Sequence, residues 1–582
     1  MDHESIDLLR EDLTAARYRV DVLDALWSEQ AASALFRGRR LPAERALGRL
    51  RASGDPLPPA ATLAALFVLG DVVAADDLAA ALPRLGVAGA SALGLVGPAS
   101  SSADGWRALL DLRPYSFVDA LGAGSWWVVS DLGEAVLGRA LDEDHVLGIG
   151  GASNTLSGLM IPTPADSVLD LGTGCGIQAM HAARHARRVV ATDISRRALS
   201  LAAMNARLNG IDSIEFRFGS LFEPVQGERF DRIVSNPPFV ITPRVEGVPQ
   251  YEYRDGGMVG DALVERVVRQ AGEHLTPGGI AQLLGNWEYR AARSAAVVAS
   301  ASESASTGAG AGAGAGLGAD AGVEVLDGLD RVRGWVEGAD GQRLDAWVIE
   351  RERQDAPTYA ETWIRDGGTR PGTPGFDPLY GAWLDDFEAR GVREVGFGYV
   401  LLRRPARAGA GTSRGRAAAP GPSASGLLTT VGVGGSGAPT PTPTLARYER
   451  VDAAIGSNPM GLGDHLAVCL AGHDWAVHRD DAALLRETLV YASDVTEERH
   501  YWPGHDDPVV MTLRQGGGFA RSVPLDTGLA AFVGACDGDL SVGAIIAAIA
   551  SLLEVSEEAL RADLLPPIRA LLADAFLRPA TP

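Results

Sequence analysis

The sequence predicts an α/β fold built on a doubly wound parallel sheet, and three observations support this prediction. The apolar stretch 167–171 runs directly into glycines at positions 172, 174 and 176, and a helical pattern follows. A second apolar stretch, 188–193, ends in Asp193, and a third, 230–235, ends in Asn-Pro-Pro-Phe. Apolar runs that alternate with helical patterns are typical of a parallel sheet covered by helices on both faces. Ligands of such sheets bind beyond the carboxyl ends of the strands, where all three motifs are expected.

The composition is that of an ordinary globular protein. Of its 582 residues, 46% are apolar and 22% are charged. The formal net charge of −22 argues against a broad electrostatic grip on naked nucleic acid, which requires an excess of Lys and Arg. The three cysteines stand far apart, so neither a disulfide framework nor a cysteine zinc site is predicted. Without a secretion signal or an apolar run of about 18 residues, we expect a cytoplasmic protein with no membrane partner.

The N-terminal part predicts helices and then strands. Residues 1–105 are expected to form a helical domain, because apolar residues recur at spacings of three and four. Residues 106–150 are expected to form a lead-in that contains strands, including the buried strand 125–130. The segment 145–156 has glycines where a loop would fold over a ligand, and Ser153, Asn154 or Thr155 could cap a helix.

Residues 151–404 are predicted to form the α/β core, followed by a linker and a separate domain. We expect core strands at 167–171, 188–193, 213–218, 230–235, 279–285, 344–349 and 395–402, and core helices at 176–186, 195–209, 260–275 and 379–390. The Gly-Ala repeats of 296–322 predict a flexible insertion, and the composition of 405–443 predicts a disordered linker. Residues 444–582 are expected to form a C-terminal α+β domain that ends in two amphipathic helices.

The motifs at the strand ends suggest a nucleotide cofactor and a planar nitrogen substrate. Glycines allow the backbone to turn tightly and approach a ligand, and Asp193 stands where a carboxylate can accept both hydroxyls of a ribose. Ile177 occupies the place of the third glycine in the dinucleotide pattern, which disfavours NAD. Asn236 and the carbonyl of Pro237 can each accept an N–H bond from an amide or an exocyclic amine. The ring of Phe239 supplies a flat face for stacking.

Together these motifs resemble those of class I S-adenosylmethionine (SAM) methyltransferases, in particular the Asn-Pro-Pro-aromatic group that modifies planar nitrogens. Residues 219–224 and 255–257 extend the resemblance to HemK-type and eukaryotic or archaeal-type glutamine methyltransferases. This resemblance implies a Rossmann-like seven-stranded core, SAM as the cofactor, and a protein glutamine amide as the acceptor. The implied catalytic residues are Asn236, Pro237 and Phe239. The implied cofactor-binding residues are Thr155, Asp170, Gly172, Gly174, Gly176, Asp193, Ile194, Ser220, Leu221 and Asn236.

The chain departs from the glutamine methyltransferase pattern at two positions. Ser220 stands where that family usually has the Asp that binds the adenine amino group, and Phe239 stands where it usually has Tyr. Phenylalanine at this place is common in ribosomal RNA guanine-N2 methyltransferases, so an exocyclic base nitrogen of RNA or DNA stays open as the acceptor. The implied partner is therefore either a translation factor protein or ribosomal RNA.

The C-terminal region leaves an alternative open. Residues 536–542 and the helices after them resemble winged-helix modules, which bind peptides, nucleic acid or other domains. The chain could accordingly be a SAM-binding regulatory or scaffold protein that acts through this module. No metal site is predicted, because the ten histidines show no pairing with a third ligand nearby. The oligomeric state is left open.

Overall fold

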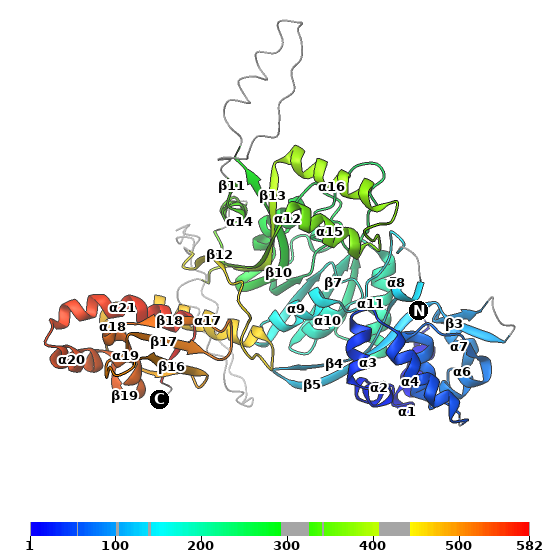
Figure 1. Cartoon of the computed structure of the whole chain (residues 1–582), viewed down its shortest axis with the longest axis horizontal. Coiled ribbons are helices and arrows are strands. Elements are labelled where there is room, and N and C mark those ends of the chain that lie inside the picture. The colour runs from blue at the N-terminus through cyan, green and yellow to red at the C-terminus, as the bar shows by residue number, and fades with distance from the viewer. Residues whose placement is uncertain are drawn as a thin grey trace, which may run out of the picture.

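The computed structural model describes residues 2–54, 56–99, 104–137, 141–292, 325–339, 343–406 and 443–580. The predicted insertion 296–322 and nearly all of the predicted linker 405–443 lie outside these ranges. Figure 1 shows an α/β core in the middle of an elongated molecule, with the N-terminal helices at one end and the C-terminal unit at the other.

The N-terminal unit is mainly helical, as predicted. Its helices are α1 (His3–Ala15), α2 (Val20–Trp27), α3 (Glu29–Phe36), α4 (Leu41–Ala52), α5 (Pro59–Leu63) with a π-helical turn (Ala64–Val68), α6 (Ala75–Ala81) and α7 (Gly86–Ala92). A small antiparallel sheet, which the sequence analysis did not predict, has the order β1-β3-β2, with β1 (Val73–Ala74), β2 (Val96–Pro98) and β3 (Gly105–Ala108). Buried residues of these helices, including Leu9 and Leu13, share one apolar cluster with core residues such as Met180 and Leu208.

The lead-in is a hairpin that is bonded to the core. Its strands β4 (Leu110–Asp119) and β5 (Gly122–Asp131) pair along their whole length, and a short helix, α8 (Glu134–Leu137), follows. The side chain of Asn205 accepts from Val129 N at 2.7 Å, and that of Asn209 accepts from Trp127 N at 2.9 Å. Both asparagines belong to the C-terminal end of a core helix, so the hairpin is held in place against the core.

The core has the predicted alternation of strands and helices. Its strands are β6 (Ala165–Leu171), β7 (Ala186–Asp193), β8 (Ile214–Phe218), β9 (Phe230–Ser235), β10 (Leu275–Ala291), β11 (Val325–Leu326), β12 (Asp345–Asp355), β13 (Val392–Arg403) and β14 (Ala446–Arg450). Its helices are α9 (Gly151–Leu159), α10 (Ile177–Ala182), α11 (Arg196–Leu208), α12 (Ala262–Ala271), α14 (Gly328–Glu337), α15 (Ala356–Asp366) and α16 (Phe376–Arg390), with 3₁₀ turns at Glu223–Val225 and Gly272–His274. Strands and helices that alternate in this way form a Rossmann-like α/β fold.

The core sheet is mixed and has nine strands, whereas a seven-stranded parallel sheet was predicted. Its order is β14-β12-β13-β10-β9-β6-β7-β8, and β11 pairs with β10. The five strands from β8 to β10 run parallel, and β13 lies antiparallel to both β10 and β12. Parallel strands buried on both faces carry near-continuous apolar runs, which is why the sequence pattern located them. The strand order reverses between β6 and β9, where an open α/β sheet leaves a crevice for ligands.

Strand β14 corrects the predicted boundary at residue 444. It pairs parallel with β12, from Ala346 beside Ala446 to Glu350 beside Arg450. Residues 446–450 therefore complete the edge of the core sheet instead of opening a separate domain. The sequence gives little signal for this strand, because its side chains are half-buried or exposed and its pairing is made by the backbone.

The C-terminal unit is α+β, as predicted. Its helices are α17 (Leu462–Val477), α18 (Asp481–Leu484), α19 (Thr527–Gly534), α20 (Val542–Leu553) and α21 (Glu557–Ala573). Its strands are β15 (Thr488–Tyr491), β16 (Val495–His500), β17 (Val510–Gln515), β18 (Ser522–Leu525), β19 (Asp537–Ser541) and β20 (Leu577–Pro579), which form the sheets β19-β15-β20 and β16-β17-β18. The likeness to winged-helix modules stays a prediction.

Helix α17 begins directly on the backbone of α9. A Cβ atom added at Gly463 would lie 2.0 Å from the carbonyl oxygen of Met160, and one at Gly461 would lie 2.8 Å from that of Gly158. From the other side, Gln282 of β10 donates to Leu159 O at 2.6 Å. The C-terminal unit and the sheet thus hold the same end of α9.

We expect Gly463→Ala to lower the free energy of unfolding by about 1 to 3 kcal/mol, because the added methyl group must displace a packed backbone. The matched control is Gly534→Ala, at the end of α19, where no atom lies within 4 Å of the added Cβ. Guanidinium denaturation of both variants would measure the difference. Equal stabilities would contradict the close packing of α17 on α9.

Candidate cofactor and acceptor site

A cavity of about 340 Å³ lies at the carboxyl ends of β6, β7 and β9, next to the reversal of strand order. Each of these strand ends contributes a short segment to its wall. The lining residues fall within 145–148, 171–178, 192–198, 219–221, 235–238 and 252–258, together with Ser153, Leu263 and Val267.

The glycine loop leaves backbone exposed to the cavity. Gly172, Gly174 and Gly176 have φ angles of +76°, +55° and +88°, which L side chains rarely adopt. No atom lies within 4 Å of a Cβ added at Gly172 or Gly174, and both line the cavity. A Cβ at Gly176 would instead lie 2.9 Å from the Cβ of Ala202 on α11. The first two glycines therefore open the backbone to a ligand, and the third permits close helix packing.

The carboxylate of Asp193 joins the ends of two strands. It accepts from Gly174 N at 2.9 Å and from Ser195 N at 2.8 Å. Both Asp193 and the next residue, Ile194, line the cavity, and the side chain of Ile194 is 60% exposed. An acidic group beside an exposed apolar side chain fits a ribose beside a purine ring.

Asp170 lies beneath the glycine loop and does not line the cavity. Thr173 Oγ1 donates to one carboxylate oxygen at 2.6 Å, and the other oxygen is buried without a hydrogen-bond partner among the described residues. Burial raises the pKa of this carboxyl to about 7. Its place at the end of β6 makes it a support of the loop.

The turn after β8 brings Ser220 and Leu221 to the cavity wall. Leu221 has a φ of +47°, an uncommon conformation for a branched side chain, and Gly219 N donates to the carbonyl of Asp193 at 3.0 Å. The turn is therefore tied to the end of β7. Ser220 carries only a hydroxyl where a carboxylate was expected from the resemblance.

Asn236 presents an unpaired acceptor at the cavity. Its Oδ1 atom is buried and has no hydrogen-bond partner within the part of the chain that the structure describes. A buried amide oxygen without a donor costs about 1 to 3 kcal/mol, so its retention calls for an explanation. Both Asn236 and Pro237 line the cavity. The oxygen is thus an acceptor without a described protein donor, in a residue that lines the cavity.

Four of the predicted site residues do not line this cavity: Thr155, Asp170, Gly176 and Phe239. Thr155 lies inside α9, whose N-cap is Gly150, and Ser153 lines the cavity from this helix. None of Ser153, Asn154 and Thr155 is the predicted cap. The ring of Phe239 packs 5.4 Å from that of Phe397 and 6.4 Å from that of Trp363.

His145 lines the cavity from the segment 145–156, which was expected to fold over a ligand, whereas Glu252 and Tyr253 beside it were not predicted. Their segments lie side by side, because Glu252 N donates to Glu143 O at 3.0 Å and the rings of His145 and Tyr253 stand 5.6 Å apart. Burial and then the nearby Asp144 raise the pKa of Glu252. Nothing in the spacing of these residues signals a site, since they lie far apart in sequence on irregular backbone.

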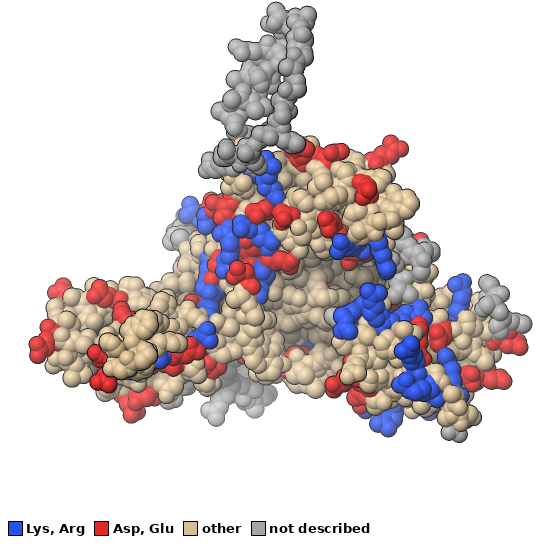
Figure 2. Space-filling view, viewed as in Figure 1, with Lys and Arg blue, Asp and Glu red and all other residues tan. Residues whose placement is uncertain are grey.

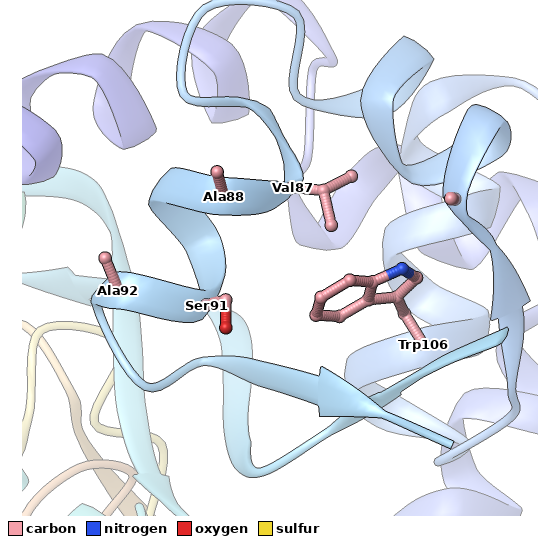
Figure 3. Close-up of a pocket in the computed structure, with 6 residues that line it drawn as sticks. Val87, Ala88, Ser91, Ala92 and Trp106 are labelled. Carbon is pink, nitrogen blue, oxygen red and sulfur yellow. The ribbon is translucent and has the colours of Figure 1, made fainter. Parts of the chain in front are cut away.

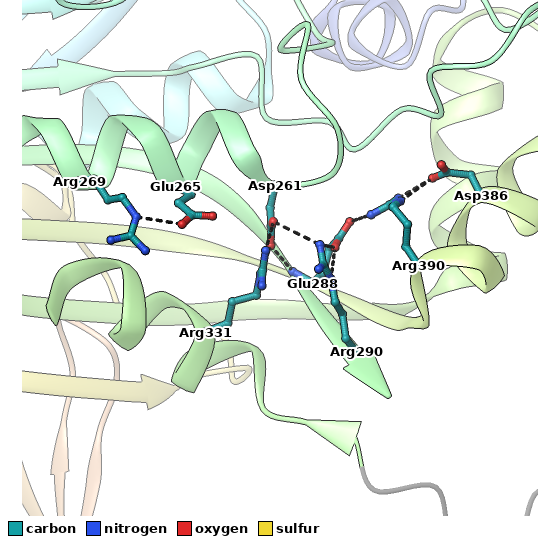
Figure 4. A network of polar contacts seen from close by, with 8 residues as sticks. All are labelled: Asp261, Glu265, Arg269, Glu288, Arg290, Arg331, Asp386 and Arg390. Carbon is teal, nitrogen blue, oxygen red and sulfur yellow. Dashed lines mark hydrogen bonds and ion pairs between the residues drawn. The ribbon is translucent and has the colours of Figure 1, made fainter. Parts of the chain in front are cut away.

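A charged network fixes the far end of the segment 252–258 (Figure 4). Asp261, at the start of α12, accepts two bonds from Arg331 at 2.7 Å each and one from Glu288 N at 3.0 Å. The carboxylate of Glu288 pairs in turn with Arg290 and Arg390. Asp261 and Glu288 are both nearly fully buried, so each depends on these cations.

The residues present fit SAM. The open backbone of Gly172 and Gly174 suits a close polar ligand, Asp193 with Ile194 suits a nucleoside, and Asn236 offers an acceptor beyond them. Within the described ranges, no group of three or more His, Cys, Asp or Glu side chains could hold a metal ion. No helix in those ranges is long and apolar enough to span a bilayer.

Family models match two parts of the chain. Residues 149–306 match the methyltransferase small domain, and residues 15–109 match a domain of unknown function (DUF7059). The first match confirms the predicted resemblance to methyltransferases, and the prediction of SAM as cofactor, for this part of the chain.

Curated relatives match about a quarter of the chain. The ribosomal protein uL3 glutamine methyltransferase of Bradyrhizobium diazoefficiens is 39% identical over 153 residues, which are 25% of this chain and 46% of the relative. The release factor glutamine methyltransferase of Xylella fastidiosa is 39% identical over 148 residues, 23% of this chain and 54% of the relative. The chain thus spans about half the length of these curated relatives. A solved 16S rRNA N2 G1207 methyltransferase of T. Thermophilus is 20% identical over 33% of this chain and 49% of its own, with a TM-score of 0.23.

We expect the free energy of unfolding of Asp170→Asn to rise relative to that of wild type as the pH increases. In the unfolded chain an Asp carboxyl has a pKa of about 3.9, whereas burial raises the folded-state pKa to about 7. The contribution of the protonated carboxyl to the free energy of unfolding is complete below the pKa of the unfolded state. It is lost as the pH rises through the pKa of the folded state. The variant should therefore gain about 2 to 3 kcal/mol relative to wild type between pH 5 and pH 8.

Urea denaturation at several pH values would measure this gain. The control is Asp563→Asn, which changes an exposed carboxylate on α21. A difference between Asp170→Asn and wild type that does not vary with pH would show that Asp170 is ionised in the folded protein throughout.

Proposed function

We propose that the chain is a SAM-dependent N-methyltransferase whose acceptor is the side-chain amide of a protein glutamine. The observation that carries the proposal is the buried, unpaired Oδ1 of Asn236 at the wall of a cavity that also exposes the glycine loop. The named functions of the curated relatives favour a glutamine amide over a base nitrogen as acceptor. A translation factor or ribosomal protein is the corresponding partner.

The cofactor would lie along the ends of β6 and β7. The open backbone at Gly172 and Gly174 would lie against its polar part, Asp193 would accept from the ribose hydroxyls, and Ile194 would contact the adenine. When bound, SAM supplies a methyl group that is already activated on a sulfonium. The protein has to place the acceptor nitrogen in line with that methyl group, which is catalysis by positioning.

Asn236 would orient and polarise the acceptor amide. An amide nitrogen is a poor nucleophile, because its lone pair is delocalised toward the carbonyl. The side-chain oxygen of Asn236 and the carbonyl of Pro237 can each accept one N–H, which draws the nitrogen toward tetrahedral geometry as charge develops. Asn236 and Pro237 would hold the nitrogen lone pair toward the methyl group that bound SAM would supply, and the methylated nitrogen would release one proton to water.

The lining at the cavity mouth also favours a protein over a nucleic acid. Glu252 and Asp193 line the cavity, and Glu143 and Asp144 adjoin it. Carboxylates at this place repel the phosphates that flank any nucleotide base. They are compatible with a neutral glutamine side chain on an exposed loop.

We expect Asn236→Ala to lower turnover by about 10²-fold or more while the dissociation constant for SAM stays nearly unchanged. Titration calorimetry would measure SAM binding, and transfer of labelled methyl to protein in a cell extract would measure turnover. The control is Asn154→Ala, an exposed asparagine on α9. Labelled product that resists protease but not ribonuclease would overturn the glutamine assignment, and SAM binding without any labelled acceptor would favour a regulatory protein.

Asp193→Asn should show the opposite pattern. It removes the charge that strengthens hydrogen bonds to the ribose, so SAM binding should weaken by about 1.5 to 3 kcal/mol, roughly 10- to 100-fold in dissociation constant. Asp212→Asn, at an exposed position after α11, serves as the control. If the SAM affinity of Asp193→Asn equals that of wild type, another group holds the ribose.

A further inference from the structure

The segment 37–51 of the N-terminal unit is strongly basic in a chain whose formal net charge is −22. It contains six arginines, Arg37, Arg39, Arg40, Arg45, Arg49 and Arg51, and one acidic residue, Glu44. Figure 2 shows blue side chains gathered over the N-terminal helices at the right of that view. A concentration of positive charge on one surface of an acidic protein needs a local explanation.

Ion pairs inside the unit account for only two of these arginines. Arg40 pairs with Glu44 at 3.1 Å, and Arg51 pairs with Asp71 at 3.0 Å. Arg39, Arg45 and Arg49 are exposed, and no described acidic side chain pairs with them. Neighbouring like charges without opposite partners lower the stability of the fold. Stability therefore does not explain why arginines occupy these positions.

The orientation of α4 places these charges outward. The helix buries Ala43, Ala46 and Leu47 in the N-terminal core. Arg45 and Arg49 stand one turn apart on the opposite, exposed face. The helix dipole favours a cation at Arg49, in the last turn, but not at Arg45 or at Arg39, which precedes the helix.

A pocket in the same unit offers a flat aromatic wall (Figure 3). A shallow, largely open depression is lined by Trp106 of β3, Ala75 of α6, and Val87, Ala88, Ser91 and Ala92 of α7. The indole of Trp106 extends toward Val87 and Ser91 from the far side of the pocket. Small side chains opposite an indole leave room for a planar ring.

A strand pairing and ion pairs run from Trp106 toward the arginine-rich segment. Trp106 pairs with Val73 of β1, and Asp71, two residues earlier, is the partner of Arg51. Arg40 also lies 4.0 Å from Asp71. Asp71 therefore connects the strand beside Trp106 to the arginine-rich segment through Arg40 and Arg51.

We propose that the N-terminal unit binds single-stranded RNA, with Arg39, Arg45 and Arg49 on the backbone phosphates and one base in the Trp106 pocket. Guanidinium groups match phosphate geometry, and an aromatic wall beside a basic surface is how single strands are bound without sequence preference. An anionic membrane fits less well, because the apolar side of α4 faces the protein core. An acidic protein fits less well, because the centre of a protein–protein interface is rich in apolar side chains. Within the described residues, α4 exposes one large apolar side chain, Leu41.

This inference goes beyond the proposed methyl transfer and does not rest on it. The test measures binding of a fluorescent oligouridine of about 16 nucleotides to the full chain by anisotropy, between about 50 and 200 mM salt. The triple variant Arg39→Gln/Arg45→Gln/Arg49→Gln should bind at least about 10-fold more weakly at the lower salt concentration. The slope of log K against log salt should fall by about 2, at 0.7 per phosphate contact on a single strand.

A matched control removes three other exposed arginines without a described ion pair, as Arg266→Gln/Arg486→Gln/Arg578→Gln. It makes the same change in net charge at scattered positions, so it should keep the wild-type slope. Thermal unfolding and SAM binding should be unchanged in both triple variants, which separates RNA binding from folding and from the cofactor site.

Trp106→Leu tests the base pocket separately. It should weaken oligouridine binding without changing the salt slope, because stacking releases no counterions. Equal loss of binding in both triple variants, or no binding by wild type at about 50 mM salt, would overturn the proposal. Arginine-dependent binding to phosphatidylglycerol vesicles or to polyglutamate, with none to oligouridine, would likewise overturn it.

Discussion

The left-handed backbone after β6 is the constraint on which the rest of the site depends. It lets Gly174 N reach the carboxylate of Asp193 and lets α11 approach Gly176 closely. Helix α11 then carries the asparagines that bond the β4–β5 hairpin, and the N-terminal helices pack on the same helix. A side chain at Gly176 would push α11 away, so the glycine loop positions the N-terminal unit as well as the cofactor.

The central strands were predictable because burial on both faces forces continuous apolar runs, as in β6 and β9. The edge of the sheet was not. Strand β14 gains its place from backbone pairing with β12, and its half-buried or exposed side chains resemble those of a loop or of any edge strand. The small sheet around β3 escaped prediction because strands of two to four residues carry too little periodicity.

The residues of the candidate site likewise include some that the sequence predicts and some that it does not. Residues at strand ends, such as Asp193 and Asn236, could be placed because parallel strands end at one edge of the sheet. Glu252 and Tyr253 could not, because their loop meets the segment at His145 only through tertiary packing. The ring of Phe239 packs against Phe397 and Trp363, a contact between the strand end and later parts of the core that no local motif encodes.

The position of β14 has a consequence for the order in which the protein is made. During synthesis the edge of β12 stays unpaired until residues 446–450 have left the ribosome, long after the other core strands. An unpaired strand edge is a template for association with other chains. Strand β14 therefore covers the exposed edge of β12. A polypeptide released from the ribosome before β14 is made would expose this edge to aggregation, even though its glycine loop would already be complete.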